Sequence, residues 1–168
     1  MNTAIFAMMT EDITFAGYGL TIYIDHTAWE SWQDDRQVHQ DAPESCGILI
    51  GSCEKATESY RVELITTPGK RDIQYRSRFV LKDPCHQKAA NLAFHRSEGC
   101  LVYLGTWHTH PEEVPTPSTV DINDWNACVE RNPDRQLYFV IVGTVKTRIF
   151  VKHDNQFKML NEHRSNTT

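Results

Sequence analysis

The chain has 168 residues, a hydrophobic content of 40%, a charged content of 23% and a formal net charge of −5. This length and composition are typical of one compact domain with its own core. The acidic balance gives no indication of a nucleic-acid partner or of an anionic membrane surface. No window approaches the roughly 18 apolar residues that a membrane span requires.

Cysteine usage indicates a reducing compartment. The sequence holds five cysteines and no C-x-x-C pair, the cysteines being Cys46, Cys53, Cys85, Cys100 and Cys128. An odd number without such pairs argues against a disulfide framework and against a cysteine-based zinc site. The opening stretch "MNTAIFAMMTED" has an apolar patch but no basic residues, so it does not have the pattern of a signal peptide. We expect a cytoplasmic protein.

The first half of the chain predicts three strands and one helix. Residues 20–24, 45–53 and 60–66 are apolar or alternating runs that favour strands, the second of them buried. Between the first two strands, Asp25 is placed to cap a helix that runs to about Gln37. Residues 67–78 are predicted to form a basic loop, because they are polar and break the alternation.

The stretch "DPCHQKAANLAFHRSEG" has clear helix boundaries. Asp83 is expected at the N-cap, Pro84 at the first helical position and Gly99 just past the end. These three residue types are those that the ends of a helix favour. The sequence therefore predicts a helix between residues 83 and 99.

The second half predicts three more strands and one more helix. Strands are expected at residues 101–110, 137–143 and 147–153, and a helix from Ser118 to about Arg131. The predicted fold class is α+β, a mainly antiparallel sheet flanked by two or three helices. We expect a single domain over residues 1–160 and a disordered tail at 161–168.

Two histidines and an aspartate form a candidate metal site. His108 and His110 lie two apart in a predicted strand and therefore face the same side. Asp121, in the first turn of the next helix, supplies a third ligand, which leaves one position open as a catalytic zinc site requires. An alternative is structural: Ser118 and Asp121 also match a helix capping box, and the histidines are then polar residues at a strand end.

A hydrolytic zinc site also needs a base that takes a proton from water. Glu44 lies just before the apolar predicted strand "CGILIG". Gly47 and Gly51 lie within that strand, where no side chain prevents another segment from coming close. The alternative is that Glu44 is an ordinary polar residue at the start of a strand.

Together these motifs resemble the JAMM (MPN/JAB) metalloprotease family. "ESCGILIG" begins at Glu44, and "HTHP" begins at His108; His110 is then followed by seven residues, Ser118, two residues and Asp121. The resemblance covers roughly residues 20–153, and it implies the JAMM/MPN fold, a curved sheet flanked by helices that is similar to the cytidine deaminase fold.

The resemblance also implies roles for these residues. His108, His110 and Asp121 would hold Zn²⁺ with a water in the fourth position. Glu44 would move the protons, and the Ser118 hydroxyl would stabilise the oxyanion together with zinc. Family members cut an isopeptide or peptide bond after the C-terminus of ubiquitin or a ubiquitin-like protein.

The spacing after Asp121 bears on the substrate. Only about fifteen residues separate Asp121 from the next predicted strand, which leaves no room for the long insertion that often grips ubiquitin in relatives of this family. The chain is similar to small bacterial stand-alone members found with E1- and E2-like proteins, including in antiphage CBASS systems. This similarity implies a ubiquitin-like protein or a CD-NTase C-terminal tail conjugated to lysine as substrate. The basic segment Lys70–Arg78 would meet an acidic substrate surface, or is simply solvated.

Three other functions are alternatives to deconjugation from lysine. Processing of a ubiquitin-like sulfur carrier uses the same site. A non-catalytic MPN scaffold would not need the complete ligand set that this chain has. A zinc deaminase, the third alternative, is excluded because it requires a P-C-x-x-C motif, which this sequence lacks.

Overall fold

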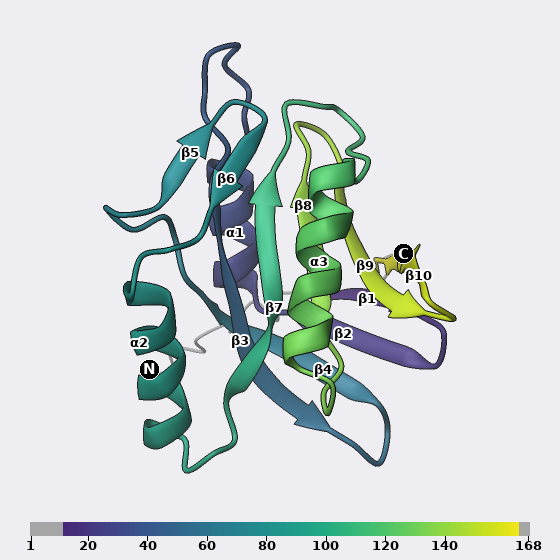
Figure 1. Ribbon diagram of the computed structural model, residues 1–168. Helices are drawn as coiled ribbons and strands as arrows, with labels where there is room; N and C mark the ends of the chain where they lie inside the picture. The colour runs from purple at the N-terminus through teal and green to yellow at the C-terminus, as the bar shows by residue number, and fades with distance from the viewer. Residues whose placement is uncertain (1–11, 165–168) are drawn as a thin grey trace, which may run out of the picture.

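One nine-stranded sheet organises the protein. The computed structural model describes residues 12–164 and arranges the sheet in the order β10-β9-β8-β7-β3-β4-β2-β1-β11 (Figure 1). Two pairings, β2 with β4 and β7 with β8, are parallel, and the others are antiparallel. The predicted α+β class is confirmed. The strands are β1 (Ile13–Gly17), β2 (Leu20–Ile24), β3 (Cys46–Glu54), β4 (Ser59–Ile65), β7 (Val102–Thr109), β8 (Tyr138–Val142), β9 (Thr147–His153), β10 (Gln156–Met159) and β11 (Asn161–His163).

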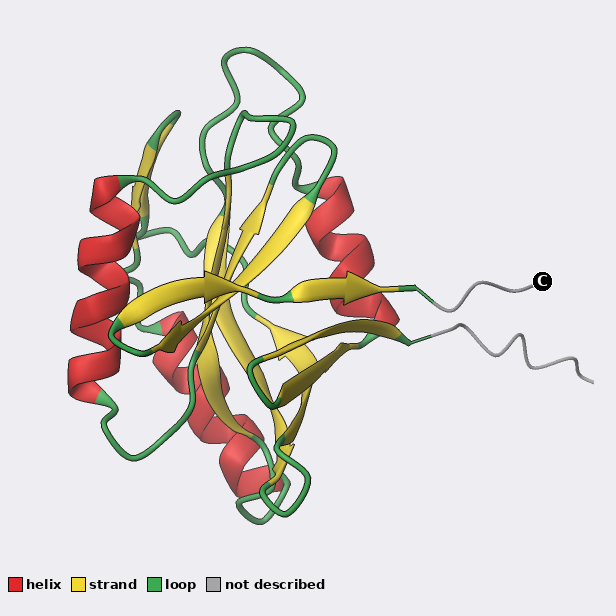
Figure 2. Ribbon diagram, turned by 90° about the vertical axis from the view of Figure 1, so that its right-hand side faces the viewer, coloured by secondary structure: helices red, strands yellow, loops and turns green. Residues whose placement is uncertain are grey.

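Helices cover both faces of the sheet (Figure 2). The helices are α1 (His26–Asp34), α2 (Cys85–Arg96) and α3 (Thr119–Arg131). On one face, Trp32 of α1 packs 6.4 Å from Trp107 between ring centroids. On the other face, Ala93 of α2 packs in the cluster of Ile48, and Trp125 of α3 stacks on Phe139 at 5.0 Å. Within residues 12–164, no helix combines the length and the hydropathy that crossing a membrane requires.

Strand β7 lies inside the sheet, between β3 and β8. Its alternation places Trp107 in the core shared with α1, while His108 faces the opposite side. The close approach expected at Gly47 is also present: a Cβ there would lie 1.9 Å from the carbonyl oxygen of Thr66. Only glycine fits at this position, so the segment after β4 lies directly against β3.

Helix boundaries differ in detail from those predicted. Helix α1 ends at Asp34 rather than near Gln37, and the side chain of Asp25 makes no capping bond. Instead, Asp25 binds Arg61 at 2.7 Å, a partner that local sequence does not reveal. At α2 the N-cap position belongs to Pro84, although the carboxylate of Asp83 still accepts the N–H of Cys85 at 2.8 Å.

The prediction that residues 67–78 form a loop was wrong in part. A hairpin of β5 (Ile73–Tyr75) and β6 (Arg78–Val80) lies there, and it stands apart from the main sheet. Strands of three residues carry almost no periodic signal, and tertiary contacts stabilise this hairpin. The predicted disorder at residues 161–168 was wrong for β11, which pairs with β1 through backbone bonds that polar side chains do not predict.

Asp72 lies just before β5 and joins the two chain segments at the open end of this hairpin. Its Oδ1 accepts the backbone N–H groups of Lys82 and Asp83 at 2.8 Å, and its Oδ2 accepts the N–H of Gly69 at 2.8 Å. His86 of α2, itself buried, contacts the same Oδ2 at 2.5 Å. The Asp72 carboxylate therefore ties both ends of the hairpin to α2.

We expect Asp72→Asn to lower stability in a pH-dependent way. Burial alone would raise the pKa of Asp72, but the N–H groups and His86 outweigh it and lower that pKa to about 2. A carboxylate whose pKa is lower in the folded state stabilises the fold above its ordinary value near 4, and this stabilisation is lost as the pH falls toward 2. Urea unfolding should show a deficit of about 2 kcal/mol at pH 7 that shrinks below pH 4. A deficit independent of pH would contradict this account.

Candidate metal centre and active site

The end of β7 and the start of α3 bring three predicted ligands together. His108 Nε2 lies 3.2 Å from Asp121 Oδ1, and His110 Nε2 lies 3.3 Å from Asp121 Oδ2. The two Nε2 atoms are 3.0 Å apart. All three side chains are buried, and their ligand atoms lie within 4.8 Å of one another. The rigid strand and the first helical turn thus aim two nitrogens and one carboxylate at one point.

The chemistry of this cluster fits a divalent cation. Two imidazole nitrogens and one carboxylate oxygen are a ligand set that zinc accepts at catalytic sites. Complete burial lowers the pKa of His108, which favours the neutral imidazole that binds metals. Burial also acts to lower the pKa of His110, but the Asp121 carboxylate outweighs it and raises that pKa. Within the described residues, the buried Nδ1 of His108 makes no hydrogen bond, and Nδ1 of His110 lies 3.6 Å from Glu112 Oε1. Nε2 is the atom of each ring that faces the Asp121 carboxylate.

Asp121 serves the helix and the cluster at once. Its Oδ2 accepts the backbone N–H of Ser118 at 2.7 Å, and its own N–H is donated to Ser118 Oγ at 3.1 Å. This is the complete capping box that the alternative interpretation anticipated. The two interpretations are compatible, because Oδ1 of the same carboxylate faces His108.

Glu44 is buried beside the cluster. It is 2% exposed, and its Oε1 lies 4.0 Å from His110 Nε2. Burial, partly offset by His110, raises the pKa of Glu44 to about 8. A carboxyl group with such a pKa exchanges protons near neutral pH, as a general base must.

Comparison with known families identifies the chain. Residues 29–155 match the family model described as prokaryotic homologs of the JAB domain. The protein is a member of the prokaryotic JAB-domain family. The match includes every candidate site residue, and the resemblance expected from the motifs is confirmed at the level of the family.

Curated relatives of this JAB-domain protein carry one shared name. A protein of Vibrio cholerae serotype O1 named CD-NTase/cGAS isopeptidase is 42% identical over 108 residues, which cover 64% of this chain and 67% of that protein. A protein of the same name from Escherichia coli TW11681 is 38% identical over 126 residues, covering 74% and 78%. A third, from Pseudomonas aeruginosa BWHPSA011, is 30% identical, covering 73% and 77%.

Solved structures share the fold of this JAB-domain protein. A protein of Desulfitobacterium hafniense aligns with a TM-score of 0.57 at 21% identity, covering 82% of this chain and 88% of that one. A protein of Salinibacter ruber aligns with a TM-score of 0.52 at 18% identity, covering 85% and 91%. These likenesses bear on the fold alone.

The β5–β6 hairpin contacts the candidate site, and no sequence pattern indicated that this segment supports Glu44. Tyr75 accepts the backbone N–H of Glu44 at 2.7 Å, and Gln74 donates its side-chain N–H to the Glu44 carbonyl at 2.7 Å. Phe79 packs over His108 with ring centroids 4.8 Å apart. The hairpin therefore holds the backbone of Glu44 and shields one candidate ligand from water.

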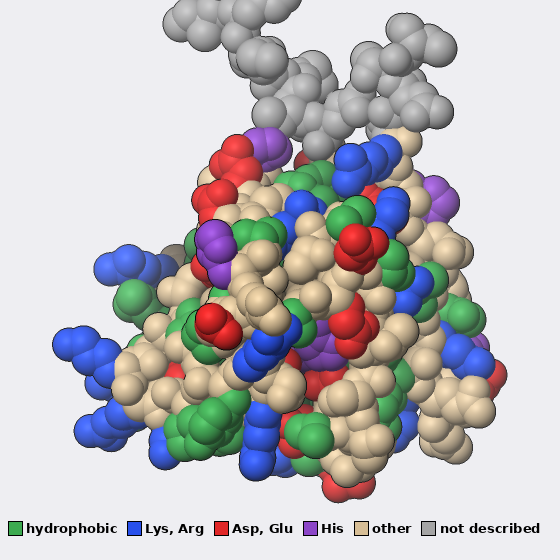
Figure 3. Space-filling model, turned by 90° about the horizontal axis from the view of Figure 1, so that it is seen from above, with side chains coloured by type: hydrophobic (Ala, Val, Ile, Leu, Met, Phe, Trp, Pro, Cys, Tyr) green, Lys and Arg blue, Asp and Glu red, His purple; other side chains and the backbone are tan. Residues whose placement is uncertain are grey.

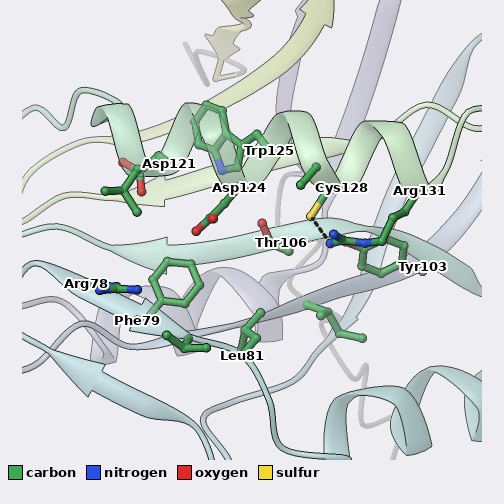
Figure 4. A pocket seen from close by; sticks show the side chains of 14 residues that line it. Arg78, Phe79, Leu81, Tyr103, Thr106, Asp121, Asp124, Trp125, Cys128 and Arg131 are labelled. Carbon is green, nitrogen blue, oxygen red and sulfur yellow. Dashed lines mark hydrogen bonds between the residues drawn. The ribbon is translucent and has the colours of Figure 1, made fainter.

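A groove runs from the cluster between β6 and α3 (Figure 4). Asp121 lies at one end of the groove, and Tyr103 and Arg131 lie at the other. Phe79 and Leu81 line one wall, and the groove has a volume of about 360 Å³. Figure 3 looks down on this end of the molecule, where acidic and histidine side chains meet and basic side chains stand around them.

Several neighbouring residues take roles other than ligation. Asp124 and Val120 both line the groove, and both are exposed, Val120 to 47%. Ser118 is exposed, so its hydroxyl can reach a bound substrate. Cys46 is fully buried, and burial raises the pKa of its thiol to about 12. A thiol with this pKa is a poor nucleophile, as expected for a structural cysteine.

Proposed function

We propose that this protein is a zinc-dependent isopeptidase of the JAMM type. It cleaves after the C-terminus of a modifier that is conjugated to a lysine of a target protein. The observation that carries the proposal is the convergence of His108, His110 and Asp121 on one buried point, with Glu44 beside it. The shared name of the curated relatives supports the same reaction class.

Each residue has a chemical role in this reaction. His108, His110 and Asp121 would hold the ion, and when bound zinc acts as a Lewis acid that acidifies water and polarises the scissile carbonyl. Glu44 accepts the proton of the attacking water and passes it to the departing lysine amine. The Ser118 hydroxyl, whose oxygen already accepts from Asp121, still has its hydrogen to donate to the oxyanion.

The groove indicates how the substrate is held. Apolar and charged side chains both line it, and four consecutive residues, 78–81, line one wall. In the part of the chain that the structure describes, β6 pairs with β5 alone, so an extended tail can lie along its other edge. An extended C-terminal tail fits this shape better than a folded surface does.

The substrate class follows from the relatives. We propose that the modifier is a CD-NTase C-terminal tail or a ubiquitin-like protein, delivered to its targets by E1- and E2-like proteins in bacterial antiphage defence. The names of the relatives support the first of these. The site chemistry is common to both, because each ends in an extended tail joined to lysine.

Zinc should be lost when the histidines are removed. We expect the wild type to contain about one zinc per chain and His108→Ala/His110→Ala to contain almost none, because one carboxylate cannot replace two imidazoles. Metal analysis of purified protein measures this content. His26→Ala/His153→Ala, which removes two exposed histidines, is the matched control. Stoichiometric zinc in the first double variant would rule out the assignment.

Glu44→Gln should retain zinc and lose turnover. The amide has nearly the same shape but cannot accept the proton, so kcat should fall by roughly 10²–10⁴. Steady-state cleavage of a modifier fusion measures kcat, and metal analysis follows zinc in parallel. Glu113→Gln, an exposed glutamate on the nearby loop, is the control. Near-normal turnover in Glu44→Gln would remove this residue from the mechanism.

Charge reversal on the hairpin should weaken substrate binding. Arg76 and Arg78 are exposed, and Arg78 also lines the groove. Arg76→Glu/Arg78→Glu should raise KM far more than it lowers kcat, the pattern of lost uniform binding. Lys88→Glu/Arg96→Glu, the same charge change on α2, is the matched control. An unchanged KM would contradict a docking role for the hairpin.

A further inference from the structure

Gln37 is a buried polar residue whose side chain joins three separate segments. It is 3% exposed and lies three residues beyond the end of α1. Its Nε2 donates to the carbonyl of Ala42 at 2.9 Å and to the carbonyl of Arg76 at 3.0 Å. Its Oε1 accepts the hydroxyl of Thr109 at 2.8 Å.

These bonds fix the orientation of the amide. A carbonyl oxygen only accepts hydrogen bonds, so the nitrogen of Gln37 must face Ala42 and Arg76. Both N–H bonds are then used, and the oxygen is used by Thr109. A buried amide with every donor paired stabilises one arrangement of its neighbours and penalises others, because any shift leaves a buried polar group without a partner.

The three segments are those that define the relation between Glu44 and the ligands. Ala42 lies two residues before Glu44, in a stretch without helix or strand. Arg76 lies in the turn of the hairpin whose Tyr75 accepts the N–H of Glu44. Thr109 lies between the two candidate ligand histidines.

Thr109 extends the connection to the other side of Glu44. Its hydroxyl oxygen accepts the N–H of Ser45 at 2.9 Å, and its backbone N–H is donated to the Ser45 carbonyl at 2.9 Å. Thr109 is fully buried, so water cannot replace these bonds. Gln37 and Thr109 together hold the chain on both sides of Glu44 against β7.

We propose that Gln37, acting through Thr109, is a positioning residue that sets the place of the Glu44 carboxylate relative to His108 and His110. This inference rests on the proposed function, in which Glu44 moves the proton. Gln37 does not touch the reacting atoms. Its removal should impair turnover because a displacement of about 1 Å at a catalytic group can cost on the order of 10²-fold in rate.

Two nearly isosteric variants test the proposal by activity. Gln37→Met and Thr109→Val keep the volume and remove the hydrogen bonds, and each should lower kcat by roughly 10- to 100-fold with KM and zinc content little changed. Thr109→Ser restores the hydroxyl and should recover most of the activity that Thr109→Val loses. The double variant Gln37→Met/Thr109→Val should be no worse than about the worse single variant, because both remove one shared connection.

Hydrogen exchange gives a readout that does not depend on activity. The N–H of Glu44 is donated to Tyr75, so its exchange should quicken by roughly tenfold or more in Gln37→Met if the segment is released. The N–H groups of β7 and β8 should keep their protection. Gln40→Met, an exposed glutamine in the same stretch, should change neither exchange nor kcat.

The outcomes separate the two proposals. A lower melting temperature with unchanged kcat, or unchanged exchange at Glu44, would overturn the positioning role of Gln37. If Glu44 exchange quickens as expected but the wild type cleaves no lysine conjugate, the connection stands and the proposed isopeptidase function fails. Faster exchange together with reduced kcat and full zinc supports both.

Discussion

The Asp121 carboxylate is the interaction on which the candidate site depends. One oxygen closes the capping box at the start of α3, and the two oxygens together face His108 in β7 and His110 directly after it. The start of α3 and the end of β7 therefore lie side by side in space, because the same carboxylate contacts both. Burial would raise the pKa of this carboxyl group, but the hydrogen bonds from His108 and His110 hold that pKa well below its usual range. An ionised carboxylate and two buried imidazoles favour a cation between them.

The candidate ligands are held by regular secondary structure, whereas Glu44 lies outside it. The candidate ligands lie in an internal strand, directly after it, and in a capped helical turn. Pairing on both sides fixes β7, the N–H of His110 is donated to Val142, and the capping box fixes the turn. Glu44, in contrast, lies in an irregular segment and depends on side-chain amides and on the hairpin. Bonds from several separate segments therefore hold Glu44, where backbone pairing alone would hold a strand residue.

The sequence predicted what local patterns control. The spacing in "HTHP" and the capping signal at Ser118 predicted the elements of His108 and Asp121, with His110 one residue past the strand end, and the apolar run after Glu44 forms β3. It missed the β5–β6 hairpin, because three-residue strands have no periodicity to detect. It also missed Gln37, which was assigned to the end of a helix. The hydrogen bonds of Gln37 go to Ala42, Arg76 and Thr109, and only the tertiary fold brings these partners together.

The β5–β6 hairpin contacts both the groove and Glu44. One strand of the hairpin lines the groove through residues 78–81, and its neighbour binds the backbone of Glu44 through Tyr75 and Gln74. Any substrate tail that displaces β6 also moves β5, since the two strands pair directly. The wall of the groove and the support of Glu44 therefore belong to one hairpin. In the proposed reaction, a tail that displaced the hairpin would also displace Glu44, so that discrimination between substrates would act on turnover as well as on affinity.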